Sequence, residues 1–195
     1  MDSSLSSRPS RLSPADWTRA ALARLGEDGI EAVRVEVLAR DLKVSKGSFY
    51  WHFDDRADLL DHMLARWERD EIEWLETGQE EMSAANRWAM FVERFIDPGR
   101  IRTEVALQAW ARRDERVARR LALLEGRRTA LIAGVLREVG FRGSSAEFWS
   151  EIVLLVCLGW LDRATRDHEF QLASRGLGEF LSELVLAASG RPAIP

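Results

Sequence analysis

Apolar residues recur every three to four positions along most of the chain, the spacing that places them on one face of a helix. No segment shows the sustained alternation of polar and apolar residues that is typical of a half-buried strand. Gly, Pro and clusters of polar residues divide the pattern into segments that predict helices over residues 14–28, 35–42, 46–53, 56–77, 84–96, 100–113, 115–139, 145–167 and 175–188. We therefore expect an all-α protein.

The first predicted helix carries start and stop signals in its sequence. Ser13 as N-cap, Pro14 at the first helical position and Asp16 two residues later favour a start at Pro14. Gly29 followed by Ile30 is typical of a left-handed C-terminal cap with its hydrophobic contact. A short helix, a tight turn and a second short helix then precede a long helix, and this order predicts a helix-turn-helix.

The composition is that of a chain that can fold without covalent cross-links. With 195 residues, 46% of them hydrophobic, it can bury a core in one extended or two small domains. The single cysteine, Cys157, lies in a helix that is apolar on nearly every side, so we interpret it as an inert buried thiol rather than a redox sensor. The polar N-terminus and the shortness of the longest apolar run, Ile152 to Leu161, predict a cytoplasmic protein with no membrane partner.

Basic side chains are placed locally rather than in excess. The net charge of -4 argues against a protein that coats nucleic acid, because non-specific affinity for DNA comes mainly from neutralised phosphates. The only two lysines, Lys43 and Lys46, nevertheless both lie in the acid-free stretch LKVSKGSFYWHF. Any contact with DNA is therefore expected in this stretch.

The same stretch has two unlike faces when it is drawn as a helix with about 100° per residue. Phe49 and Phe53 point to one side, where they can pack on the preceding helix. Gly47, Ser48 and Trp51 point to the other side and make a poor solvent face unless a partner covers it. A DNA major groove fits this face, because glycine permits close approach, serine can hydrogen-bond a base edge and tryptophan can contact a thymine methyl.

The beginning of this segment suits a phosphate group. Helix N-termini attract phosphates, so the backbone from Ser45 to Gly47 is an expected anchor to which Lys46 adds charge. On helical spacing alone, Tyr50, Trp51 and His52 could equally be surface residues that pack on the following long helix.

The run LARDLKVSKGSFYWHFDDRADLL, with Gly29 and Ile30 before it, resembles the signature of the tetracycline repressor (TetR) family of transcriptional regulators. The resemblance covers about residues 12–67, and the rest of the chain is similar only in helix count and order. It implies an N-terminal three-helix DNA-binding domain with the helix-turn-helix, a long linking helix, and a C-terminal helical domain that binds a ligand and dimerises.

The resemblance also implies roles for single residues. Tyr50 and His52 would contact phosphates, Ser48 and Trp51 would face bases, and Arg56 would hold a phosphate from the start of the long helix. With the residues already discussed, the expected DNA-binding set is Lys43, Ser45, Lys46, Gly47, Ser48, Tyr50, Trp51, His52 and Arg56.

Three positions depart from the family's pattern. Lys43 stands where the family usually has a glycine, so either Lys43 adopts the left-handed conformation or the turn differs, and the lysine is expected to add a phosphate contact. Arg34 replaces the usual threonine cap, and Glu36 stands where a basic residue is common. These two changes weaken the expectation that the helix over residues 35–42 contacts DNA.

The rest of the sequence offers little for catalysis. Asp58 and His62 have the i, i+4 spacing of metal ligands, but capping and solvation explain the acidic cluster better. No Ser/His/Asp arrangement, glycine-rich phosphate loop or metal motif is present in the sequence. We therefore expect no enzyme activity, no metal site and no cofactor.

Aromatic residues are concentrated on two helices of the C-terminal half. Core packing explains most of them, but the resemblance implies an effector pocket built from these helices, and apolar pockets with a few polar groups are the usual design. On this ground a small apolar or aromatic effector is expected to contact Trp88, Phe91, Phe95, Leu107, Trp110 and Leu131.

The last two predicted helices have more apolar positions than one chain can cover. Pairing both with their two-fold mates in a four-helix bundle would bury the excess and predicts a C2 homodimer. The expected interface consists of Phe148, Ile152, Leu155, Val156, Gly159, Trp160, Leu177, Phe180, Leu181 and Leu184.

The predicted organisation is a flexible arm over residues 1–11, a helix-turn-helix domain over 12–56, an effector-binding and dimerisation domain over 57–190, and a flexible tail over 191–195. The predicted function is that of a ligand-responsive transcriptional regulator, a repressor by the resemblance, which binds a palindromic operator as a homodimer and is released by its effector. Activation, or control by a protein partner, stays open. The alternative is an all-α ligand-binding protein or enzyme with a vestigial helix-turn-helix, against which the outward Lys46, Ser48 and Trp51 argue.

Overall fold

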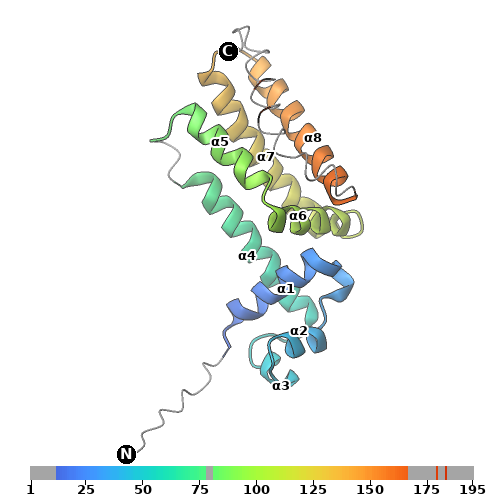
Figure 1. Ribbon diagram of the computed structural model, residues 1–195. Coiled ribbons are helices and arrows are strands. Elements are labelled where there is room, and N and C mark those ends of the chain that lie inside the picture. The colour runs from blue at the N-terminus through green and yellow to red at the C-terminus, as the bar shows by residue number, and fades with distance from the viewer. Residues whose placement is uncertain (1–11, 78–80, 167–178, 180–182, 184–195) are drawn as a thin grey trace, which may run out of the picture. The chain divides into compact units, whose positions relative to one another are not determined.

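The computed structural model describes residues 12–77, 81–166, 179 and 183 of the chain. Regular secondary structure in these residues is helical throughout (Figure 1), which confirms the all-α class. The elements are α1 (Pro14–Asp28), the 3-10 helix η1 (Ile30–Ala32), α2 (Val35–Asp41), α3 (Lys46–Phe49), α4 (Arg56–Glu76), α5 (Ala84–Phe95), α6 (Pro98–Ala111), α7 (Glu115–Glu138) and α8 (Ser145–Arg166). Four predicted interface residues, Leu177, Phe180, Leu181 and Leu184, lie outside the described residues.

Local capping explains where α1 begins and corrects how it ends. The backbone N–H and the hydroxyl of Ser13 both donate to Oδ2 of Asp16, at 2.9 and 2.7 Å, so the predicted start is confirmed. Gly29 has a φ of 78° but a ψ of 179°, which is not the left-handed cap that we predicted. Glycine can adopt this conformation, and the chain continues from it into η1 instead of turning back on α1.

Three helices of the C-terminal half begin at side-chain caps. Ser83, Asp97 and Asp114 each accept a hydrogen bond from a backbone N–H in the first turn of α5, α6 and α7, respectively. Helix α6 therefore starts at Pro98, two residues earlier than predicted, because proline is well tolerated in a first helical turn where its missing N–H is not needed.

The chain divides into an N-terminal unit, Met1–Arg66, and a C-terminal unit, Trp67–Pro195, and α4 contributes residues to both. The domain boundary expected after residue 56 stays a prediction. In the N-terminal unit, α1, α2 and α3 surround a core whose largest fully buried side chains include Trp17, Leu25, Leu38 and Phe49. Trp17 meets the ring of Phe49 edge-on at 5.3 Å, so the very short α3 is held by packing rather than by its own length.

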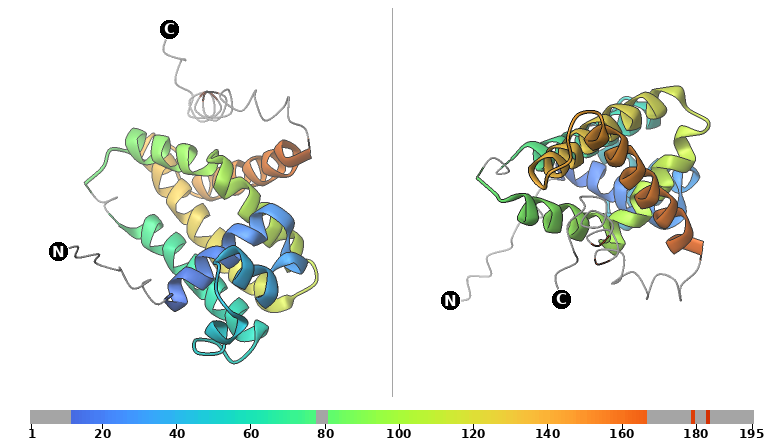
Figure 2. Two further views of the ribbon diagram at one scale, coloured as in Figure 1. Left: turned by 60° about the horizontal axis from the view of Figure 1, so that its bottom comes forward. Right: turned by 90° about the horizontal axis from the view of Figure 1, so that it is seen from above.

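The C-terminal unit is a bundle of helices around α7. Helices α7 and α8 lie side by side, and α5 and α6 pack against α7 (Figures 1 and 2). Phe91, Ile132, Val153 and Cys157 belong to the shared core. Burial raises the pKa of Cys157 to about 12, so the thiol stays protonated at neutral pH, as an inert core residue does.

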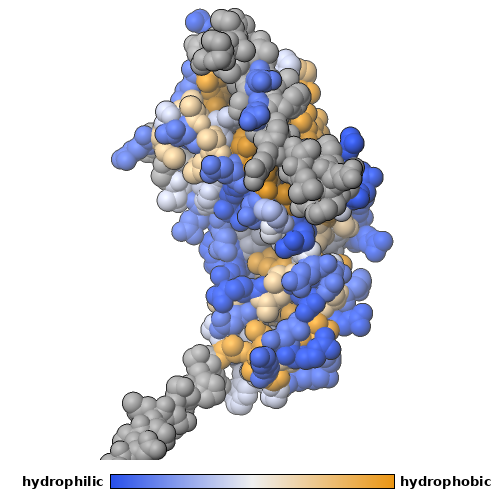
Figure 3. Space-filling model, in the orientation of Figure 1, coloured by the Kyte–Doolittle hydropathy of each residue, from blue (hydrophilic) through white to orange (hydrophobic). Residues whose placement is uncertain are grey.

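The visible surface of the described residues is mostly hydrophilic (Figure 3). No helix in the described ranges is both long and apolar enough to cross a membrane. The same ranges contain no cluster of three or more side chains that could hold a metal ion.

Candidate functional site

The turn between α2 and α3 is built around Lys43. Lys43 has a φ of 57°, so of the two alternatives the left-handed conformation is the one adopted. The backbone N–H of Lys43 donates to Arg40 O at 3.1 Å, and that of Val44 donates to Ala39 O at 2.9 Å. The turn thus keeps its shape with a lysine where glycine would adopt the same φ more easily.

Helix α3 has one buried and one exposed side. Phe49 and Phe53 are buried, with ring centroids 5.3 Å apart, whereas Tyr50 is 63% and Trp51 75% exposed. Gly47 is exposed, and a Cβ atom there would meet only Ser45 Oγ, at an ordinary 3.6 Å. The chain's own packing therefore does not require a glycine at this position.

The charges around α3 are partly neutralised within the unit. Lys46 Nζ forms an ion pair of 2.9 Å with Glu36 on α2, and both side chains are exposed. This hydrogen bond from Lys46 lowers the pKa of Glu36 below its ordinary value. A phosphate that reached Lys46 would compete with Glu36 for the ammonium group.

Arg56 and His52 face inward at least in part. Nε and Nη2 of Arg56 donate to Val33 O at 2.6 Å and Ile30 O at 2.7 Å, so the guanidinium ties the start of α4 to η1 and the residue after it. Nε2 of His52 is buried and has no hydrogen-bond partner in the described part of the chain. The bonds of Arg56 could not be read from the motif, because they depend on how distant segments fold.

The acidic cluster before α4 is a capping arrangement. Oδ2 of Asp58 accepts from the backbone N–H of Asp54 at 3.0 Å, and the backbone N–H of Asp58 donates to Asp55 Oδ1 at 2.9 Å. His62 Nδ1 lies 2.9 Å from Asp58 Oδ1. These contacts satisfy the carboxylates locally, as the capping interpretation predicts.

The surface that these residues form has the groups that recognise a duplex. Lys43, Lys46 and Gly47 are exposed, Ser48 is half-buried, and the two exposed aromatic rings follow directly. Ammonium groups and backbone N–H groups contact phosphates, while hydroxyl and apolar groups read base edges.

The C-terminal unit contains a small cavity with a volume of about 30 Å³. Its apolar wall is formed by Trp74, Phe91, Phe95, Ile101 and Leu161, and its polar wall by Glu71, Arg94, Arg100, Glu104 and Arg128. Of the six expected effector residues, Phe91 and Phe95 line this cavity. Trp88, Leu107 and Trp110 are buried elsewhere, and the half-buried Leu131 packs against the core.

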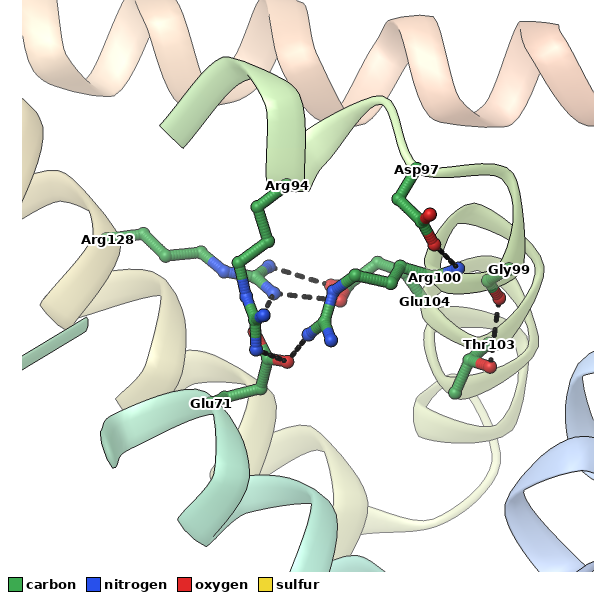
Figure 4. A network of polar contacts seen from close by, with 8 residues as sticks. All are labelled: Glu71, Arg94, Asp97, Gly99, Arg100, Thr103, Glu104 and Arg128. Atoms are coloured by element: carbon green, nitrogen blue, oxygen red, sulfur yellow. Dashed lines mark hydrogen bonds and ion pairs between the residues drawn. The ribbon is translucent and has the colours of Figure 1, made fainter. Parts of the chain in front are cut away.

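The five charged side chains form one network in which α4, α5, α6 and α7 take part (Figure 4). Arg128 donates to both carboxylate oxygens of Glu104, each at 2.9 Å. Oε1 of Glu71 pairs with Arg94 at 2.9 Å and also with Arg100. Oε2 of Glu71 lies 3.5 Å from Arg128, which joins the two halves of the network.

Burial and mutual pairing act against each other on these groups. Burial raises the pKa of Glu104, but the charge and hydrogen bonds of Arg128 outweigh it, so the pKa lies below its ordinary value. Burial lowers the pKa of Arg128, and Glu104 reverses this into a net rise. The pKa values of Arg94 and Arg100 are lowered, first by burial and then by the charge of Arg128.

Sequence reasoning missed these charged residues, although two of them carry a recognisable signal. Arg128 occupies a position on the apolar stripe of α7, between Leu124 and Ile132. Glu104 stands in the same way between Ile101 and Leu107 on α6. A charged residue in the middle of an apolar stripe predicts a buried charge that needs a partner.

Two further features of the C-terminal unit lie on or near α8. A second cavity, of about 190 Å³, is lined by Val105, Gln108, Ala109, Arg112, Leu158, Leu161 and Asp162.

The other feature is an exposed apolar face of α8. Phe148 and Leu155 are 60% and 62% exposed, and Ile152 and Gly159 lie on the same face. Val156 is half-buried against the core, and Trp160 is buried in it.

Part of the N-terminal unit matches a known protein family. Residues 18–63 match the family model of bacterial regulatory proteins, tetR family. No curated protein matches the chain.

Several solved structures share the fold. One is a protein from Saccharomonospora viridis, described as a transcriptional regulator and solved with choline, with a TM-score of 0.70, 15% identity and coverage of 85% of this chain and 95% of that one. A TetR transcription regulator from Haloarcula marismortui has a TM-score of 0.65 and 17% identity, with 88% and 96% covered. The complex of SmeT with triclosan has a TM-score of 0.66 and 18% identity, with 90% of each chain covered.

The matched segment contains the whole of the helix-turn-helix, including the turn at Lys43 and the exposed Trp51, and the helices that follow it have the fold of solved regulators. Residues 18–63 thus match the tetR family of bacterial regulatory proteins, and the chain shares its fold with solved transcriptional regulators.

Proposed function

We propose that this chain is a ligand-responsive transcriptional repressor that binds a palindromic operator as a homodimer and leaves it when a small effector binds to the C-terminal unit. The observation that carries the proposal is the exposed Trp51, held in place by Phe49 and Phe53 buried behind it. A tryptophan that is three-quarters exposed on a rigid support is an unfavourable solvent surface, and contact with a partner removes this cost.

The proposed DNA contacts are supported by the exposure of the residues around α3 and, for Tyr50, His52 and Arg56, by the resemblance to the family. Gly47, Ser48 and Trp51 face bases, while Lys43, Ser45, Lys46, Tyr50 and His52 serve the phosphate backbone. Arg56 has Nε and Nη2 engaged by carbonyl oxygens, which leaves Nη1 for a phosphate. Its main role in the proposal is to hold the start of α4 against η1 and Val33.

The proposed dimer uses the exposed apolar face of α8. Phe148, Ile152, Leu155 and Gly159 recur every three to four residues, and Phe148 and Leu155 are exposed. A two-fold axis beside this face would bury the same residues of both copies against each other. Trp160 also belongs to α8, but it is buried in the core of its own chain. In this arrangement it anchors α8 to that core instead of contacting the second copy.

The proposed control by a small molecule draws on the similar structures that hold choline and triclosan. A dimer that binds a palindrome needs its two copies of α3 about 34 to 36 Å apart, or a multiple of that spacing. We propose that the effector favours a conformation in which the α4 helices are displaced, so that this separation no longer fits the operator.

Selection of bound duplexes from a random pool tests the DNA-binding part. The expected result is a palindromic site whose base preference is relaxed by Trp51→Ala. Leu123→Ala, which removes another exposed apolar side chain (52% exposed) from α7, should leave the selected site unchanged. A pool without enrichment, or the same site selected by Trp51→Ala, would contradict the proposal.

A further inference from the structure

The wall of the small cavity carries one more positive than negative charge. Three guanidinium groups face two carboxylates, and the five residues are Arg94, Arg100, Arg128, Glu71 and Glu104. Asp70 and Asp97 act on Arg94 from exposed positions, where solvent screens them, and Glu125 acts on Arg128 from outside the cavity wall. An unmatched cation at a partly buried wall is costly, and a bound anion would neutralise it.

The carboxylate of Glu71 is shared among three arginines, Arg94, Arg100 and Arg128. Arg128 and Glu104 satisfy each other through two parallel hydrogen bonds, so this pair is complete. The remaining guanidinium groups, those of Arg94 and Arg100, both pair with the same oxygen of Glu71. A second carboxylate at this place would give each of the two arginines a partner of its own.

Arg94 also has an unused donor and an aromatic neighbour. Its Nε is buried and has no hydrogen-bond partner within the described residues. Its guanidinium lies 4.4 Å from the centroid of the Trp74 ring, and the rings of Phe91 and Phe95 line the same cavity. The site thus offers cationic donors at one end and an aromatic wall at the other.

We propose that this cavity binds an effector of the organic-acid class, a carboxylate with an apolar or aromatic body, whose carboxylate takes the place of Glu71 on Arg94 and Arg100. The inference deepens the proposed function, on which it rests for its regulatory meaning, and adds a negative charge to the apolar effector expected from the sequence. The apolar body contacts Trp74, Phe91 and Phe95.

Because the cavity is small, a ligand has to displace a side chain and cannot simply fill empty space. About 30 Å³ holds one or two water molecules but no aromatic acid, so an entering carboxylate has to displace a group that is already present. Glu71 is that group, because it carries the same functional group on the same donors. Arg94 and Arg100 are the partly exposed members of the network, so the acid meets them first when it enters from solvent.

Exchange at Glu71 would act directly on α4. Glu71 is the member of the network that α4 contributes, and its partners lie on α5, α6 and α7. Transfer of Arg94 and Arg100 to the ligand removes two of the ion pairs that hold α4 in the C-terminal unit. Helix α4 also supplies residues 56–66 to the N-terminal unit, so its release is a direct way for the effector to reach the DNA-binding segment.

Thermal stability of the full chain with and without probe compounds tests the site. Phenylacetate and octanoate should raise Tm increasingly with concentration, whereas phenylacetamide, octanamide and phenethylamine should not. Arg94→Gln and Arg100→Gln should each weaken binding of the acids by about tenfold or more, because a charge-assisted hydrogen bond is lost. Glu71→Gln should strengthen it, because the competing carboxylate is gone. Arg119→Gln, on the exposed side of α7, should change nothing.

A second variant guards against loss of folding. In Glu71→Ala the acceptor is removed, so propionate should restore Tm more than propionamide does. Glu115→Ala removes an exposed carboxylate of α7 and should show no difference between the two compounds. Equal effects of acids and amides on the parent, no binding of either acid, or weaker binding in Glu71→Gln would overturn the inference.

Binding of the selected duplex, measured in parallel, separates the two proposals. A chain that binds the acids but no duplex would refute the proposed function and leave the carboxylate site standing. A chain that binds the duplex but neither acid would refute the carboxylate site alone.

Discussion

The two units carry their candidate sites in opposite ways. In the N-terminal unit, aromatic and polar groups stand on the surface and are supported by two buried phenylalanines. In the C-terminal unit, charged groups are enclosed by aromatic and aliphatic side chains. The groups of the first site are exposed to solvent. The groups of the second site are at least partly removed from solvent and form ion pairs with one another.

This difference decides what a substitution does in each unit. An exposed side chain of the N-terminal site can be removed with little change in stability, because most of its surface already faces water. Removal of a buried charge lowers stability strongly, because its partner stays buried without a neutralising charge. In the N-terminal unit, binding and folding should therefore separate at the level of single residues, whereas in the cavity they should not.

Phe49→Ala should have the largest effect. The side chain is fully buried beneath α3, and its loss should lower the free energy of unfolding by about 3 to 5 kcal/mol. DNA binding should disappear with it, because α3 loses its anchor. Chemical denaturation measures the change, with Tyr50→Ala as the neighbouring control, for which we expect less than about 0.5 kcal/mol. Equal losses in the two variants would show that burial does not distinguish the two sides of α3.

Arg128→Met should cost somewhat less, about 3 kcal/mol near neutral pH, because methionine fills part of the space but leaves Glu104 without its main partner. The pKa of Glu104 is lowered in the parent, so the stability that this group contributes is present above its ordinary value of 4.5 and is lost as the pH falls. In the variant, burial without Arg128 raises that pKa, and protonation then relieves the buried charge.

The loss caused by Arg128→Met should therefore shrink as the pH falls from above 4.5, where Glu104 of the variant takes up its proton, to below 4.5, where Glu104 of the parent does. Denaturant midpoints over a pH series measure this. Arg119→Met, which removes an exposed arginine of the same helix, is the control and should show neither the loss nor the recovery. A loss that is independent of pH would mean that Arg128 matters for its volume and not for its charge.

Lys43→Gly should have the smallest effect on folding, a gain of less than about 1 kcal/mol. Glycine accepts the φ of 57° without the steric cost that lysine has, although part of the gain is lost to its greater freedom in the unfolded chain. Lys43→Ala keeps the steric cost and should show no gain. Both variants should reduce the dependence of DNA affinity on salt to the same extent, because each removes the phosphate contact proposed for Lys43. A different salt dependence in the two would show that the turn and not the charge sets the contact.

The sequence predicted those features that depend on neighbouring residues. The start of α1 follows from Ser13 and Asp16, which are three positions apart. The burial of Phe49 and Phe53 and the exposure of Trp51 follow from helical spacing, even though α3 itself ends at Phe49 and continues as a turn.

Features that depend on distant segments could not be predicted in the same way. The bonds of Arg56 to Ile30 and Val33 need the arrangement of η1 beside α4. The network around Glu71 and Arg128 needs four helices to meet, and their apolar stripes indicate that charges are buried but not which of them pair. Trp88, Leu107, Trp110 and Leu131 do not line the small cavity; they were expected from the aromatic content of their helices and from the resemblance, and neither distinguishes a core from a cavity.

The scarcity of lysine has a practical consequence. Lys43 and Lys46 are the only side-chain amines of the chain, and both flank the turn before α3. An amine-directed label or cross-linker is therefore addressed to this one surface, apart from the terminal amine, and protection of the two lysines by a bound duplex would map the interface without any substitution. Any enzyme that modifies lysine would likewise find both of its targets on the surface proposed to meet DNA.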